Sequence, residues 1–155
     1  MQTYPSKSIL KNLAAHRVTV KFEFLPAPDY DESQHEFLKE TLLDSIEALA
    51  ALTVPGFVPL DESPCDAVLH IEVTCCVIGG LTTAPKFTPN QYLCVVAGRV
   101  LTNLVGMSAH ELVTVWSSST LSTSEALTFS AKVLDAVKST IQSYNQSLAE
   151  AKLES

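Results

Sequence analysis

The chain has 155 residues, a net charge of −7 and a pI near 5.0, which exclude several classes of protein. This length is usual for a single domain with a proper core. The 10 Lys and Arg residues are scattered, so we expect no nucleic-acid partner, because phosphate binding needs clustered cations. No run approaches the roughly 18 apolar residues of a membrane-spanning helix, so no transmembrane segment is expected. The charged fraction of 17% is below the typical value of about 25%, which favours a protein partner or self-association.

The compartment is left open by the sequence. The start, Met1 to Pro5, lacks the apolar core of a secretory signal. The protein is therefore either cytoplasmic, or periplasmic or outer-membrane-associated if a leader has been removed.

The four cysteines are Cys65, Cys75, Cys76 and Cys94, without framework spacing. We expect buried, reduced thiols, and a cross-strand disulfide between Cys76 and Cys94 remains the alternative for an exported protein.

The first half of the chain predicts an arm, a strand and a helix. Residues 1–16 are polar and mixed and are expected to form a loose amino-terminal arm, followed by a single domain over residues 17–153. Strict alternation from Arg17 to Leu25 predicts a strand, and the prolines after it predict a loop. The capping box Ser33-Gln34-His35-Glu36 predicts a helix to about Leu52. Its expected apolar stripe comprises Phe37, Leu38, Leu42, Leu43, Ile46, Leu49 and Leu52.

The second half predicts three strands and a long helix. The strands are expected at about 67–78, 92–102 and 110–118, with Trp116 on the opposite face from Val115. Ser122-Thr123-Ser124-Glu125 repeats the capping-box pattern and predicts a helix over 122–153. Its apolar positions are Leu127, Leu134, Val137, Ile141, Tyr144 and Leu148. Such a stripe fits either a helix that covers a sheet or a coiled coil, and we favour the cover because a four-stranded sheet needs one.

This order, β-α-β-β-β-α, predicts an α+β fold that is a two-layer sandwich. The first strand, helix and second strand should form a right-handed crossover with parallel strands, and the later strands an antiparallel meander. Two helices then cover one face of a mixed four-stranded sheet. On the other face we expect polar residues on the first two strands, and apolar residues on the third strand and near Cys76. An apolar sector of this kind is covered by the arm or long loop, or marks a partner interface.

The sequence contains no motif that indicates a catalytic, cofactor or metal site. No phosphate-binding glycine motif occurs, and we expect no cofactor. Cys65, His70 and Cys75 are evenly spaced, but His70 and Cys75 point to opposite faces of a strand and cannot share a metal, so no metal site is expected. The four histidines, His16, His35, His70 and His110, are expected in surface or hydrogen-bonded structural roles. The serines of 117–119 fit a strand end better than a nucleophile.

Three strand segments carry a resemblance at family level. They are Asp66-Ala67-Val68-Leu69-His70-Ile71-Glu72-Val73, Gly98-Arg99-Val100-Leu101 and Glu111-Leu112-Val113-Thr114-Val115-Trp116. With the helix that follows, they resemble small α/β domains of bacterial envelope accessory proteins, such as the amino-terminal domain of TolB and the curli secretion lipoproteins. The resemblance covers about residues 17–145, and no lipoprotein cysteine accompanies it. It implies a non-catalytic protein-interaction module.

The sequence therefore predicts a non-catalytic interaction or assembly module that binds a protein partner or itself. Its expected partner-binding residues are Ile78, Leu81, Phe87, Tyr92, Cys94 and Trp116. The alternative is a small-molecule-binding protein or enzyme with a pocket between the sheet and the loop at 79–91, with Tyr92, Trp116 and His70 as lining.

Overall fold

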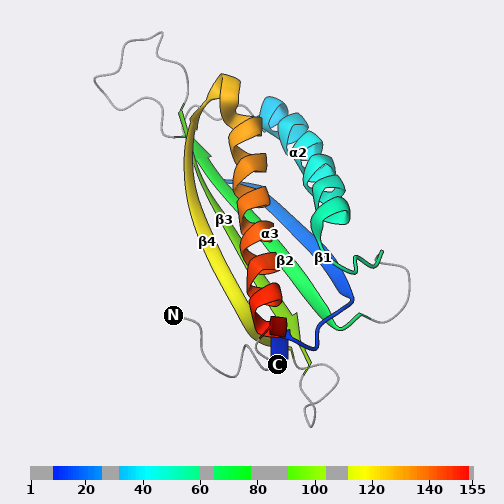
Figure 1. Cartoon of the computed structure of the whole chain (residues 1–155). Helices are drawn as coiled ribbons and strands as arrows, with labels where there is room; N and C mark the ends of the chain where they lie inside the picture. The colour runs from blue at the N-terminus through cyan, green and yellow to red at the C-terminus, as the bar shows by residue number, and fades with distance from the viewer. Residues whose placement is uncertain (1–8, 26–31, 60–64, 78–90, 104–111, 154–155) are drawn as a thin grey trace.

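A computed structural model describes residues 9–25, 32–59, 65–77, 91–103 and 112–153 of the chain (Figure 1). Its elements follow the expected order β-α-β-β-β-α. They are β1 (His16–Phe24), α2 (Glu32–Thr53), β2 (Ala67–Val77), β3 (Gln91–Thr102), β4 (Val113–Glu125), a 3-10 turn η1 (Ala126–Thr128) and α3 (Phe129–Leu153). The predicted α+β class is confirmed.

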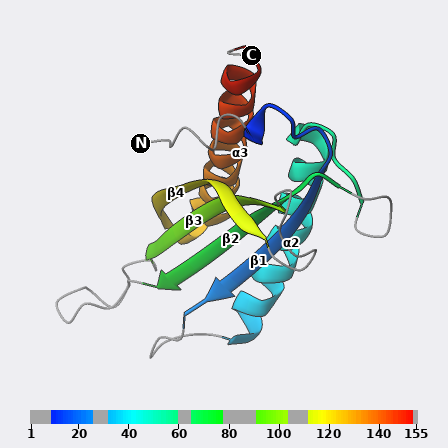
Figure 2. The same ribbon diagram turned by 90° about the horizontal axis from the view of Figure 1, so that it is seen from below.

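The four strands form one mixed sheet in the order β1-β2-β3-β4. β1 and β2 are parallel, while β2 pairs antiparallel with β3 and β3 with β4. Figures 1 and 2 show α2 and α3 side by side on one side of this sheet, with α2 over β1 and α3 over β3 and β4. This is the two-layer sandwich that the order of elements predicts, with a parallel crossover followed by a meander.

The core lies between the sheet and the two helices. On β2, Leu69, Ile71, Val73 and Cys75 alternate with half-buried residues, because successive side chains of a strand point to opposite faces. The stripe of α3 meets this face, and its buried members include Val137, Ile141, Tyr144 and Leu148. The interpretation of α3 as a cover for the sheet is therefore confirmed.

The end of the expected arm is packed into this core. Leu10 and Leu13 are buried in a short turn, in which the Asn12 and Leu13 amides donate to the carbonyls of Ile9 and Leu10. The two leucines close the core at the amino-terminal end of β1. Residues 9–15 are thus tied to the domain, a packing that their mixed polarity does not predict.

The start of the last helix differs from the prediction. Residues Ser122 to Glu125 continue β4, where Glu125 pairs with Gln91, and the helix begins only at Phe129. Leu127, expected in the buried stripe, is almost fully exposed in η1. Serine and threonine suit both a helix cap and a strand, and here the ladder with β3 decides between them.

Helix α2 begins at Glu32, just before the predicted capping box, and ends at Thr53. Leu42, Ile46 and Ala50 bury its inner face. Phe37 and Leu52 are exposed, although the expected stripe includes both. A helix that lies at the edge of a two-layer sandwich buries a narrower stripe than the apolar residues of α2 span.

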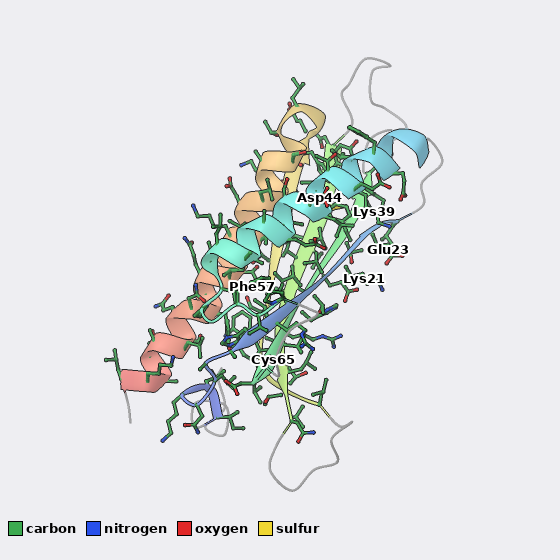
Figure 3. All side chains as sticks on the ribbon, turned by 90° about the vertical axis from the view of Figure 1, so that its right-hand side faces the viewer. Lys21, Glu23, Lys39, Asp44, Phe57 and Cys65 are labelled. Carbon is green, nitrogen blue, oxygen red and sulfur yellow. A yellow bond between two sulfur atoms is a disulfide. The ribbon has the colours of Figure 1, made fainter. Side chains whose placement is uncertain are left out.

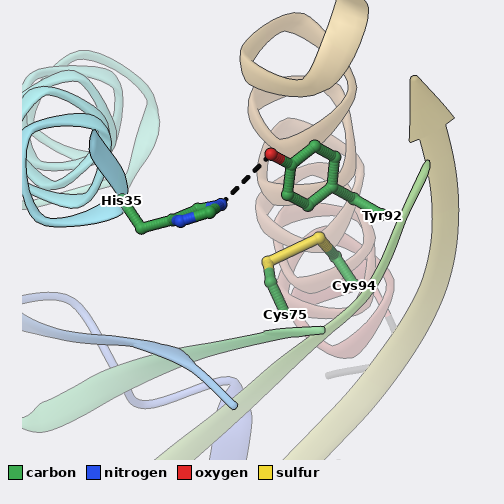
Figure 4. Close-up of a disulfide and its surroundings, with 4 residues drawn as sticks. All are labelled: His35, Cys75, Tyr92 and Cys94. Atoms are coloured by element: carbon green, nitrogen blue, oxygen red, sulfur yellow. Dashed lines mark hydrogen bonds between the residues drawn. A yellow bond between two sulfur atoms is a disulfide. The ribbon is translucent and has the colours of Figure 1, made fainter. Parts of the chain in front are cut away.

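A disulfide links β2 to β3, and it joins Cys75 to Cys94 (Figure 4). Both cysteines are fully buried on the helix-covered face, while Cys65 and Cys76 are free and half-buried. The expectation of reduced thiols is wrong for this pair, and so is the alternative of Cys76 with Cys94. The register between β2 and β3 determines which cysteines pair, because Cys75 lies directly opposite Cys94 while Cys76 lies opposite Leu93.

Candidate functional site: the open face of the sheet

The expected partner-binding residues do not form an accessible site among the described residues. Ile78, Leu81 and Phe87 lie outside the part of the chain that the structure describes. Tyr92, Cys94 and Trp116 are 6%, 1% and 3% exposed in the core beneath the helices. These three residues pack the domain and are not available to a partner or to a small-molecule pocket.

One buried polar cluster lies where α3 meets β1. Pro55 carries only a carbonyl, so His16 Nδ1 donates to it at 2.8 Å, and Nε2 accepts from the Tyr144 hydroxyl at 2.5 Å. Burial lowers the pKa of His16 and raises the pKa of Tyr144, so both groups are neutral. This arrangement satisfies two buried polar side chains and joins three segments, which is a structural role.

A second cluster lies near the disulfide at the opposite end of the core. His35 Nε2 and the Tyr92 hydroxyl are 3.1 Å apart (Figure 4). Both rings also pack against Phe24. Phe129 closes the cluster, with its ring centroid 4.4 Å from that of Tyr92. Aromatic packing of this kind fixes the first turns of α2 and α3 against the sheet.

The face of the sheet opposite the helices is therefore the surface to consider. Within the described residues no element covers it, and it divides into two parts. One part is polar and comprises Thr19, Lys21, His70, Glu72 and Arg99, which we name the polar patch. The other part is apolar and comprises Cys76, Leu93, Val95 and Leu121, which we name the apolar patch.

The polar patch is held by weak pairs. Thr19 Oγ1 and His70 Nδ1 are 2.7 Å apart, and the Glu72 carboxylate lies 3.7 Å from His70 Nε2 and 3.9 Å from Lys21 Nζ. Figure 3 shows Lys21 and Glu23 on the side of β1 that faces away from α2. Exposed pairs at such distances add little stability, so this patch is a solvated surface.

A shallow groove of about 410 Å³ crosses the polar patch from β2 to β4. On the open face of β3, the short side chain of Ala97 lies among the longer side chains of His70, Glu72 and Arg99, which also line the groove. Serines of β4 form its far wall at the edge of the sheet. Among the residues that the structure describes, no group of three or more His, Cys, Asp or Glu side chains could hold a metal ion.

The apolar patch exposes side chains that water does not favour. Leu121 is 67% exposed and Val95, directly opposite it on β3, is 39% exposed. Cys76 and Leu93 form the neighbouring cross-strand pair and are half-buried. Contiguous exposed apolar residues of this kind mark interaction surfaces. In the described part of the chain, no helix is both long and apolar enough to cross a bilayer.

A β-bulge in β4 determines which face Leu121 occupies, and the predicted strand, which ended at Ser118, did not include this residue. Val100 pairs with Trp116 but Leu101 pairs with Thr114, which leaves Val115 as the extra residue. Val115 and Trp116 are consequently both buried, and the expectation that they lie on opposite faces is wrong. Every residue after the bulge changes face, so Leu121 points away from the core. The long side chain at the centre of a serine- and threonine-rich strand was the available signal.

The comparisons with known proteins give fold-level likenesses only. No family model matches the chain, and no curated protein matches it significantly. A DUF330 protein from Xanthomonas campestris is 10% identical to this chain and has a TM-score of 0.44. The match covers 93% of this chain and 89% of that protein. A protein from Helicobacter pylori, described as a neuraminyllactose-binding hemagglutinin homolog, is 11% identical, with coverages of 93% and 87% and a TM-score of 0.42.

Rare lipoprotein B from Shewanella oneidensis is 14% identical, with coverages of 90% and 99% and a TM-score of 0.29. The identities and TM-scores are too low to carry an argument about function.

Proposed function

We propose that the protein is a non-catalytic interaction module that binds another protein through the open face of its sheet. The observation that carries this proposal is the apolar patch, where Leu121 and Val95 expose apolar surface side by side on the face opposite the described helices. The helix-covered face cannot serve, because its Tyr92, Cys94 and Trp116 fill the core. A charged fraction of only 17% supports the same role.

We further propose that the protein works in an oxidising compartment, as an accessory component of a bacterial cell envelope. The Cys75–Cys94 disulfide supports this proposal, because disulfides persist in exported proteins and are rare in the reducing cytoplasm. The strand pattern shared with the TolB amino-terminal domain and the curli secretion lipoproteins supports it as well.

The test is a photo-crosslinking amino acid introduced at Leu121 in cells that produce the protein. Irradiation should give a discrete protein adduct, which mass spectrometry then identifies. The matched control carries the same amino acid at Phe37, which is 73% exposed on α2 and lies away from the open face. Absence of a protein adduct at Leu121, or equal adducts at both positions, would refute the proposal.

A further inference from the structure

We propose that the partner is a second copy of this chain, and that the two copies pair antiparallel along the outer edges of their β4 strands. This inference rests on the proposed function and specifies its partner. Within the described residues, β4 is the last strand of the sheet, and nothing pairs with its outer edge. We name the segment Ser117–Glu125 the β4 outer edge.

The first step is to establish which backbone groups of β4 face outward. The Cα atoms of Cys75 and Cys94 are 4.2 Å apart, the short spacing of an antiparallel pair that exchanges no backbone hydrogen bonds. The Cys75 carbonyl instead accepts from the Leu25 amide at the β1 side, at 2.8 Å. The next residue, Val95, therefore directs its backbone groups toward β2.

Since Val95 bonds to β2, the Val95–Leu121 pair exchanges no backbone hydrogen bonds. Leu121 consequently directs its N–H and C=O away from β3, toward the free edge. The register runs without a shift from Ser117 to Glu125, so every second residue of this segment does the same. A second strand would find its hydrogen-bonding groups on Ser117, Ser119, Leu121, Thr123 and Glu125.

The β4 outer edge lacks the features that keep sheet edges apart. It contains no lysine and no proline, and its only charge is the terminal Glu125. The bulge lies before it, at Val115. Long edge strands without such protection can pair with other strands, and natural monomers normally blunt them. This edge therefore has the properties of an interface.

The register of the pairing follows from the limits of the segment. Leu121 lies four residues from Ser117 and four from Glu125, so it is the midpoint. A two-fold axis there pairs the whole segment with itself: Ser117 opposite Glu125, Ser119 opposite Thr123, and Leu121 opposite Leu121. The outward backbone groups of both strands are then in phase.

The side chains on the open face match in this register. At the centre, the two Leu121 side chains lie side by side, and each is flanked by Val95 of its own copy. This row of four apolar side chains buries the most exposed part of the apolar patch. Next to this row, hydroxyl side chains pair across the axis, an arrangement that is favourable in sheets. Association thus removes the apolar surface that carries the proposed function.

Charges also match across the interface. Arg99 lies beside Ser117 on the open face, and Ser117 faces Glu125 of the second copy. Arg99 and that carboxylate are then two strand spacings apart, about 10 Å between Cα atoms. The short side chain of Ser117 lets both long side chains extend over it, and the groove of about 410 Å³ bordered by Arg99, Ser117 and Ser119 leaves room for them. The two-fold axis produces this pair twice.

The first test uses proline, because its effect depends on which way the replaced N–H points. Ser119→Pro removes an outward N–H and should leave a folded monomer, while wild type forms dimers by sedimentation velocity and light scattering. Thr120→Pro removes an N–H that bonds to β3 and should destabilise the fold itself, which circular dichroism measures. A dimer that survives Ser119→Pro in the folded protein overturns the proposed interface.

The second test is a charge exchange, which a merely structural role would not reproduce. Arg99→Glu and Glu125→Arg should each raise the dimer dissociation constant about tenfold, because each places like charges across the axis. The double variant should return it to within about threefold of wild type. Equal weakening in the single and double variants contradicts the register.

The outcomes for the two proposals are separable. A purified wild-type protein that stays monomeric up to its solubility limit overturns the pairing of two copies. If the Leu121 crosslink in cells then identifies a different protein, the interaction module stands and only its partner changes. If neither experiment finds a protein at this face, the proposed function fails as well.

Discussion

Gly98→Ala tests how closely α3 packs on the sheet. A Cβ atom at Gly98 would lie 2.5 Å from Thr140 Cγ2 and 3.4 Å from Trp116 Cζ3. Thr140 cannot move aside easily, because a β-branched side chain on a helix has few rotamers and its hydroxyl donates to the Ala136 carbonyl at 2.9 Å. Helix α3 therefore has to shift away from β3 to accommodate the methyl group.

The size of the effect follows from two opposing terms. Overpacking of a core by one methyl group costs about 1–3 kcal/mol of the free energy of unfolding. Removal of a glycine from a strand returns about 0.5–1 kcal/mol. We expect Gly98→Ala to lower the free energy of unfolding by about 1–2 kcal/mol. Thr140→Ser removes the obstructing methyl group, keeps the hydroxyl, and alone should cost about 0.5–1.5 kcal/mol.

The assay is urea denaturation followed by the fluorescence of Trp116, the single tryptophan of the chain. The double variant Gly98→Ala/Thr140→Ser should be no less stable than Thr140→Ser alone, which gives a favourable coupling of about 1 kcal/mol or more. Ser139→Ala, at an exposed neighbour on α3, is the matched control and should show no coupling. Additive costs for Gly98 and Thr140 would refute the close contact between α3 and β3.

Three further predictions concern the disulfide, the buried histidine and one turn. The denatured protein should expose two reactive thiols without reductant and four with it, and four thiols without reductant would contradict the Cys75–Cys94 pairing. The double variant Cys75→Ala/Cys94→Ala should lose about 3 kcal/mol of stability in denaturant titrations. Because burial lowers the pKa of His16, stability should fall as pH decreases below its unfolded value of about 6.5, and His16→Asn should lack this slope in thermal melts across pH. Gly56→Ala should unfold at lower temperature, because Gly56 has φ +60° and a Cβ atom would clash with the Ala14 carbonyl oxygen; an unchanged melting temperature contradicts that close approach.

The order of elements was predictable because each element carries its own periodicity. The alternation of β1 and the stripe from Val137 to Leu148 depend only on which residues face the core. Two-layer packing then follows, since a four-stranded sheet with one apolar face requires a cover. The site was not predictable in the same way, because it depends on how strands align with one another.

Strand register is the information that a single sequence lacks. Cys75 and Cys76 are equally plausible partners for Cys94 until the alignment of β2 with β3 is known, and a shift by one residue exchanges the two faces. The same uncertainty placed Tyr92 and Cys94 on the partner surface, although the structure buries both. Their neighbours Leu93 and Val95 lie on the open face of β3 instead.

The bulge at Val115 links the stability of the domain to its proposed interaction. Without the bulge, the alternation that buries Val115 would carry Leu121 into the core and leave Trp116 on the open face. The extra residue instead lets Val115 and Trp116 both pack beneath α3, where the Trp116 indole donates to Ser147 Oγ at 3.2 Å. As a result, the residues of the β4 outer edge whose backbone groups point outward are the same residues whose side chains, like that of Leu121, lie on the open face. Deletion of Val115 should therefore leave Thr114 opposite Leu101 and Trp116 opposite Val100, so that Leu121 keeps its place on the open face while the core beneath α3 loses the Val115 side chain.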